Sequence, residues 1–85
     1  MKIAYQPVMV RTGEEGEGQL VFADGWLVGV LVRLSDRHPG KEGHWFLESG
    51  YGPLDSHQHP TFDGLRAAEA WIRARLADYV KSPWG

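Results

Sequence analysis

The chain has 85 residues, a net charge of −2 and no cysteine. This length is that of one small domain, and the absence of cysteine excludes a disulfide framework and thiolate chemistry. The small net charge gives no overall positive field that would draw nucleic acid. No apolar run reaches the roughly 18 residues of a membrane span, so we expect a cytoplasmic protein without membrane contacts.

The N-terminal part of the chain is typical of strands and turns. Residues 2–11 form a first predicted strand, and Pro7 restricts it to a sheet edge or a bulge because proline cannot donate to a ladder. Residues 12–18, TGEEGEG, have no apolar side chain, and we expect them to form a mobile acidic loop. Leu20–Phe22 is a short strand that leads to the turn signal Asp24-Gly25.

Residues 26–34, WLVGVLVRL, are apolar on both alternating faces, which is typical of a strand in the middle of a sheet. A polar loop at 35–43 separates this strand from the next one, His44–Tyr51. Strict alternation divides the central strand into two faces. We assign to the helix the face that comprises Trp26, Val28, Val30, Val32 and Leu34.

Residues 61–80 are predicted to form a helix, followed by a tail at 81–85. Their apolar residues recur at the helical period, and Glu69 precedes Arg73 by four residues, which is the favourable order for an ion pair. The buried stripe comprises Leu65, Ala68, Ile72, Leu76 and Tyr79.

These elements predict a single α+β domain over residues 1–85, an antiparallel meander of three to four strands followed by one C-terminal helix packed on one sheet face. One helix covers one face, so the other face requires cover from the tail or from another chain. We therefore expect a small non-enzymatic accessory or regulatory module that acts through a protein partner or pairs as a homodimer. Its predicted interaction surface is Leu27, Leu31, Trp45, Leu47 and Trp84.

The sequence offers little support for catalysis, a cofactor or a metal. His57 and His59 share a face on an extended chain, but a diagnostic second ligand pair is missing, so we expect no metal site. Asp55, Ser56 and His57 are adjacent, whereas catalytic triads are assembled from separated positions. We expect no enzyme activity and no cofactor.

Nucleic-acid binding is the alternative function. Basic side chains gather in and around the 33–45 loop, and Trp45 and Tyr51 offer rings on which bases can stack. Asp36 and Glu42 in the same loop argue against a strong basic footprint. The predicted contacts are Arg33, Arg37, Lys41 and His44.

Overall fold

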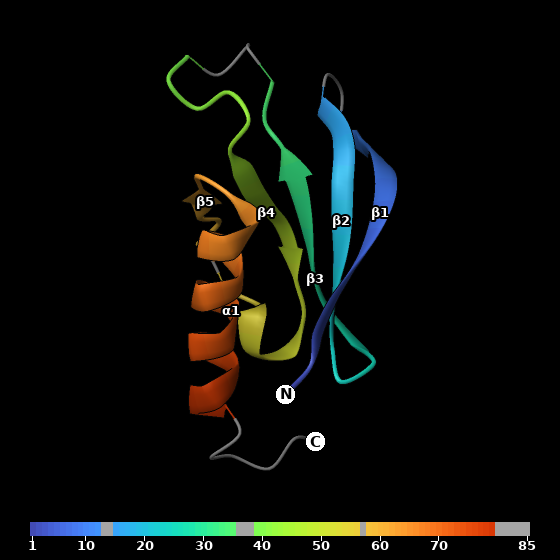
Figure 1. Cartoon of the computed structure of the whole chain (residues 1–85), viewed down its shortest axis with the longest axis vertical. Coiled ribbons are helices and arrows are strands. Elements are labelled where there is room, and N and C mark those ends of the chain that lie inside the picture. Colours follow the sequence, from blue (N-terminus) through green and yellow to red (C-terminus); the bar gives the residue numbers. More distant parts are fainter. Residues whose placement is uncertain (13–14, 36–38, 57, 80–85) are drawn as a thin grey trace.

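The computed structural model describes residues 1–12, 15–35, 39–56 and 58–79. Five strands form one antiparallel sheet in the order β1-β2-β3-β4-β5, and one long helix packs against it (Figure 1). The elements are β1 (Ile3–Thr12), β2 (Glu15–Ala23), β3 (Trp26–Arg33), β4 (Trp45–Gly50), a short 3-10 helix η1 (Gly52–Leu54), β5 (Thr61–Phe62) and α1 (Leu65–Tyr79).

This arrangement confirms the predicted α+β meander with a C-terminal helix. The sheet has five strands because Phe62 lies opposite Trp45 and Thr61 opposite Phe46, so two residues expected in the helix form β5 instead. The helix accordingly begins at Leu65. β1 is an edge strand, as the position of Pro7 predicted.

The predicted mobile loop at residues 12–18 is wrong for its C-terminal part. From Glu15 onwards the chain belongs to β2, and Gly18 lies opposite Val8 of β1. Antiparallel pairing satisfies the backbone N–H and C=O groups whatever side chains they carry, so an acidic, glycine-rich segment can continue a hairpin. Residues 13 and 14 lie outside the described part of the chain.

The turn between β2 and β3 is the one that its sequence predicts. Asp24 has a φ of 50° and Gly25 a φ of 88°. Positive φ at both central residues is the geometry of a two-residue type I′ hairpin, which Asp-Gly favours. This tight turn places Trp26 directly opposite Ala23 at the start of β3.

A bulge in β3 decides which of its side chains face the helix. Val21 lies opposite Gly29 and Phe22 opposite Leu27, so Val28 is an extra residue without a partner in β2. One extra residue moves every side chain beyond it to the other face of the sheet. The strict alternation that we predicted therefore fails in the middle of the strand.

The face assignment from sequence is correct before the bulge and wrong after it. Val28 belongs to the core against the helix, as predicted, but it is joined there by Leu31. Val30 and Val32 instead lie on the opposite face of the sheet, level with Leu20 and Gly18 of β2.

The helix buries the stripe that its periodicity predicted. Ala68, Ile72 and Leu76 are at most 1% exposed, and Leu65 is partly buried beside them. The side chain of Tyr79 lies outside the described part of the chain.

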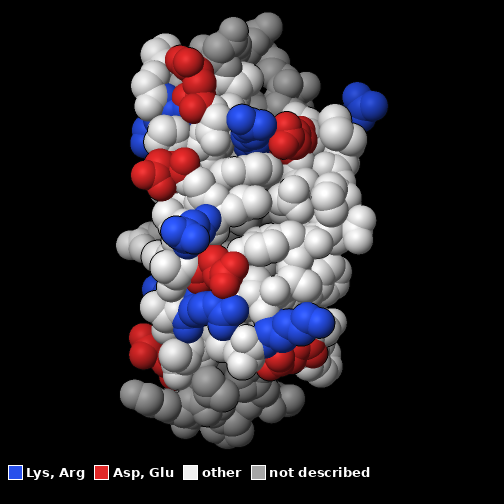
Figure 2. Space-filling view, in the orientation of Figure 1, with Lys and Arg blue, Asp and Glu red and all other residues white. Residues whose placement is uncertain are grey.

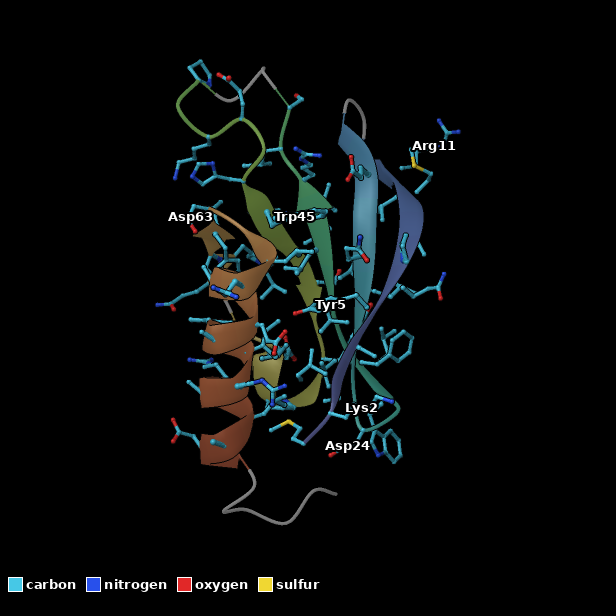
Figure 3. The ribbon with its side chains drawn as sticks, in the orientation of Figure 1. Lys2, Tyr5, Arg11, Asp24, Trp45 and Asp63 are labelled. Atoms are coloured by element: carbon cyan, nitrogen blue, oxygen red, sulfur yellow. The ribbon has the colours of Figure 1, made fainter. Side chains whose placement is uncertain are left out.

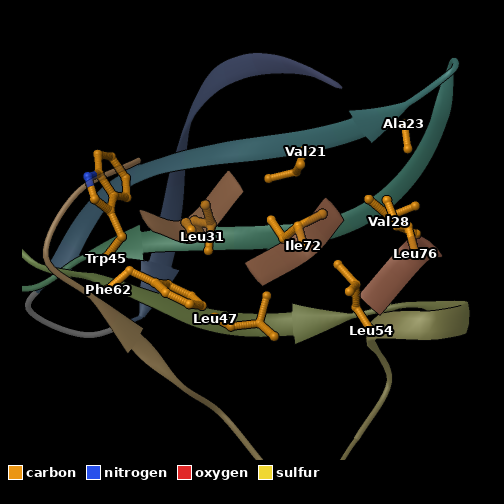
Figure 4. Packing of buried hydrophobic residues seen from close by; sticks show 11 residues of the cluster. Val21, Ala23, Val28, Leu31, Trp45, Leu47, Leu54, Phe62, Ile72 and Leu76 are labelled. Atoms are coloured by element: carbon orange, nitrogen blue, oxygen red, sulfur yellow. The ribbon is translucent and has the colours of Figure 1, made fainter. Parts of the chain in front are cut away.

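The core fills the space between α1 and one face of the sheet (Figure 4). Its members come from every element except β1, whose Ile3 and Tyr5 pack at its margin. The buried cluster is Val21, Ala23, Val28, Leu31, Trp45, Leu47, Leu54, Phe62, Ala68, Ile72 and Leu76.

Candidate interaction surfaces

The structure places most of the predicted interaction surface inside the protein. Leu31 is fully buried, Leu47 is 1% exposed and Trp45 is 7% exposed, and all three pack against the helix side of the sheet. This part of the prediction is wrong because the bulge at Val28 turns Leu31 inward. Leu47 lies opposite Leu31 and Trp45 opposite Arg33, so the register of β4 on β3 turns these two side chains inward as well. Leu27 is 39% exposed.

The fifth predicted residue, Trp84, lies outside the described part of the chain.

The sheet face remote from the helix, which we call the open face, is apolar. Its residues follow from the pairing register, in which Gly18 lies opposite Val32, Leu20 opposite Val30 and Phe22 opposite Leu27. Among the described residues, no helix or strand crosses this face. Its apolar side chains are Val8, Val10, Leu20, Phe22, Leu27, Val30, Val32 and Phe46.

The open face is close-packed at its centre and half-buried around it. Val30 is 9% and Val32 is 2% exposed, although both lie outside the cluster against the helix. Gly18 allows this packing, because a Cβ at that position would lie 2.8 Å from Val10 Cγ2. The absence of a side chain lets β1 side chains lean over β2 towards the centre of the sheet.

Charge is absent from the middle of the molecule on the β1 and β2 side. Figure 2 shows an uncharged area over these strands, with acidic and basic groups above, below and on the helix side of it. At the hairpin end of the sheet, Trp26 is 69% exposed and Leu27 beside it is also exposed. Phe22 and Trp26 were not predicted to be surface residues, although the adjacent Asp24-Gly25 turn was an available signal for Trp26.

A second feature is a cleft of about 550 Å³ between β1 and α1. The Tyr5 hydroxyl donates a 2.9 Å hydrogen bond to Glu69 Oε1, and Arg73 Nε donates a 2.9 Å bond to Glu69 Oε2. Arg73 Nη1 also donates to the Met1 carbonyl oxygen at 2.9 Å, which ties the start of the chain to the helix. Figure 3 shows Tyr5 in the space between β1 and α1. The Glu69–Arg73 pair was predicted, but the contact with Tyr5 was not, since it joins residues 64 positions apart.

The pKa values of Tyr5 and Glu69 both move away from neutral pH in this cluster. Burial, and then the hydrogen bond to Glu69, raise the pKa of Tyr5. Hydrogen bonds from Arg73 and Tyr5 lower the pKa of Glu69. Around neutral pH the phenol is therefore protonated and the carboxylate charged, which is the combination that the hydrogen bonds require.

The residues of the nucleic-acid alternative are partly engaged with neighbours. Arg33 Nη1 lies 3.5 Å from Glu17 Oε1, and Lys41 Nζ donates to Thr61 Oγ1 at 3.3 Å. His44 is half-buried, and its Nδ1 atom is buried without a hydrogen-bond partner among the described residues. Arg37 lies outside those residues.

The histidines expected to be poor metal ligands are described in part. His59 Nδ1 lies 2.9 Å from the Leu47 carbonyl oxygen, and its ring stacks on Phe46 at 5.9 Å between centroids. His57 falls outside the described residues, within which no group of three or more histidine and carboxylate side chains is placed to hold a metal ion.

Comparison with protein families, curated proteins and solved structures gives no match to this chain. Within the described residues, α1 is too short and too polar to cross a membrane.

Proposed function

We propose that this chain is a small non-enzymatic module that works through protein contacts and pairs with a second copy of itself through the open face. The observation that carries the proposal is the unequal cover of the sheet. The helix buries one face, whereas the open face presents apolar side chains from four strands with no described element across it. Extended apolar patches of this kind are uncommon on monomers unless they mark an interaction site.

A second copy is the partner that the open face fits best. A two-fold pair buries the same patch on both subunits, so it needs a surface that complements itself. The open face meets this condition where β2 and β3 pair, because Gly18 and Val32, Leu20 and Val30, and Phe22 and Leu27 are all uncharged there. Phe22 and Leu27, which lie opposite each other at the exposed end of this face, are the proposed contact centre.

The chemistry of the cleft supports a non-enzymatic role. General acid–base catalysis works best when the pKa of the catalytic group lies near the operating pH. The pKa shifts of Tyr5 and Glu69 go the other way, upward for the phenol and downward for the carboxyl group. We interpret their hydrogen bonds as a tie between β1 and α1.

Nucleic-acid binding through the 33–45 loop remains the alternative, with less support. Arg33 has an acidic neighbour in Glu17, and Lys41 contacts Thr61. The first of these contacts reduces the positive potential that a phosphate backbone requires.

Sedimentation velocity over a range of protein concentrations tests the proposal. We expect the wild-type chain to sediment as a dimer at high concentration and Leu27→Glu to sediment as a folded monomer, because a charge at the contact centre would be buried without a partner. Ala74→Glu adds the same charge on the exposed side of α1 and should leave the dimer intact. Runs with a short DNA duplex test the alternative.

A wild-type chain that stays monomeric at every concentration would contradict the proposal. So would a dimer that Leu27→Glu leaves unchanged. Co-sedimentation with the duplex by a monomeric chain would favour the nucleic-acid alternative.

A further inference from the structure

The free edge of β1 has backbone groups that point away from the sheet. The Lys2 carbonyl oxygen accepts a hydrogen bond from the Asp24 N–H, so Lys2 faces β2. In an antiparallel pair the facing alternates along the strand, so Ala4 also faces β2, whereas Ile3 and Tyr5 direct their N–H and C=O groups to the free edge. A second chain in extended form can hydrogen-bond to such an edge.

Pro7 limits this edge to a short stretch. The next outward-facing residue after Tyr5 is Pro7, which has no N–H, and the Gln6 side-chain amide donates to the Pro7 carbonyl oxygen at 3.3 Å. The accessible part of the edge is therefore Ile3–Tyr5, with two donors and two acceptors two residues apart. This spacing matches the repeat of a strand, roughly 6.6 Å for two residues.

The cleft between β1 and α1 lies beside this short edge. Leu65 and Ala70 provide apolar surface in it, and two arginines and one glutamate leave it with a net positive charge. Glu69 and Arg73 satisfy each other, and Arg73 is further held by the Met1 carbonyl. Arg66 is exposed and has no hydrogen bond or ion pair with any residue that the structure describes.

We propose that this cleft binds an extended acidic segment of a partner protein, which pairs with Ile3–Tyr5 as a sixth strand and places a carboxylate against Arg66. A guanidinium group forms paired hydrogen bonds with a carboxylate, which gives both affinity and register. The alternating side chains of the segment would lie on Leu65 and Ala70. This site is separate from the open face, and its occupant is a different chain.

A second copy of this chain does not supply the required segment. The β1 strand, Ile3–Thr12, contains no aspartate or glutamate, so pairing of two β1 edges would leave Arg66 without an anion. The acidic residues Glu15 and Glu17 lie in β2, which is already paired with β1 and β3 on its two sides. Pairing of two copies through their β1 edges therefore does not supply the anion, and we assign the cleft to a partner of other sequence.

The test starts from short random peptides displayed on phage and selected on the immobilised full-length chain. We expect enriched sequences that combine an acidic residue with alternating β-branched residues. A synthetic peptide of the enriched sequence should bind wild type and lose roughly tenfold or more in affinity with Arg66→Glu, measured by calorimetry. Arg11→Glu makes the same change in net charge at an exposed site outside the cleft and should bind like wild type.

The pair Ile3→Pro and Ile3→Ala tests strand addition. Both variants lose the packing of the Ile3 side chain, but only proline removes the outward N–H, and a first strand position tolerates proline. We expect Ile3→Pro to bind the peptide several-fold more weakly than Ile3→Ala, with circular dichroism confirming that both are folded.

Three results would overturn this inference. They are the enrichment of no sequence or of sequences without an acid, an affinity unchanged by Arg66→Glu, and equal binding by the two Ile3 variants. The separate monomerising variant Leu27→Glu should bind the peptide like wild type. Its behaviour distinguishes failure of the cleft site from failure of the proposed dimer.

Discussion

The two faces of the central strand β3 carry the same apolar residue types but are covered in different ways. On the helix side, Leu31 is fully buried within a cluster that includes Ile72 and Leu76. On the open face, Val30 and Val32 are buried although they lie outside that cluster, and Leu27 at the strand's start is exposed. The comparison shows that the middle of a sheet face can be buried without the helix, whereas the end of the same face stays exposed.

The comparison is tested most strongly by truncating one leucine on each face. Leu31→Ala should lower the free energy of unfolding by about 2–5 kcal/mol, because it leaves a cavity under the helix. Leu27→Ala should lower it by less than about 1 kcal/mol, because the side chain is partly exposed already. Urea denaturation at a concentration where the chain is monomeric measures both. Equal losses would mean that the two faces are equally covered.

The outcome for Leu31 shows where sequence reasoning succeeded and where it failed. The helix stripe was predictable because a 3.6-residue period is sampled over fifteen residues of α1, and no irregularity interrupts it. The faces of β3 were not, because one extra residue at Val28 reverses a period-two pattern that is apolar in both phases. Gly29, a glycine inside a run of branched residues, was the only local sign of a bulge.

The cleft could not be predicted from the sequence for a different reason. Its helix half, the pair Glu69 and Arg73, follows from spacing along one element. Its strand half, Tyr5, is brought there by the fold of the whole chain, and the sequence between them carries no sign of the contact. The acidic segment from Glu15 was misread because its composition resembles a loop, whereas pairing with β1 sets its conformation.

We expect a smaller loss of stability from a glycine substitution on the open face. Gly18→Ala should destabilise the chain by about 1–3 kcal/mol, because its Cβ would lie 2.8 Å from Val10 Cγ2 and 3.0 Å from the Leu31 carbonyl oxygen. Gly16→Ala is the matched control, since its Cβ would meet only the end of Met9, an 81% exposed and flexible side chain, within 2.8 Å. Thermal unfolding compares the two variants. A harmless Gly18→Ala would show that the open face is loosely packed.

Pairing of two copies through the open face can be tested by observing both faces of one molecule. The chain has three phenylalanines: Phe22 and Phe46 on the open face and Phe62, 8% exposed, against the helix. Labelling with fluorophenylalanine gives one ¹⁹F resonance for each, assigned through Phe→Tyr variants.

On dilution from a concentrated solution, we expect the Phe22 and Phe46 resonances to shift together while that of Phe62 stays in place. Resonances from all three positions that do not change with concentration, or a shift at Phe62 alone, would contradict it.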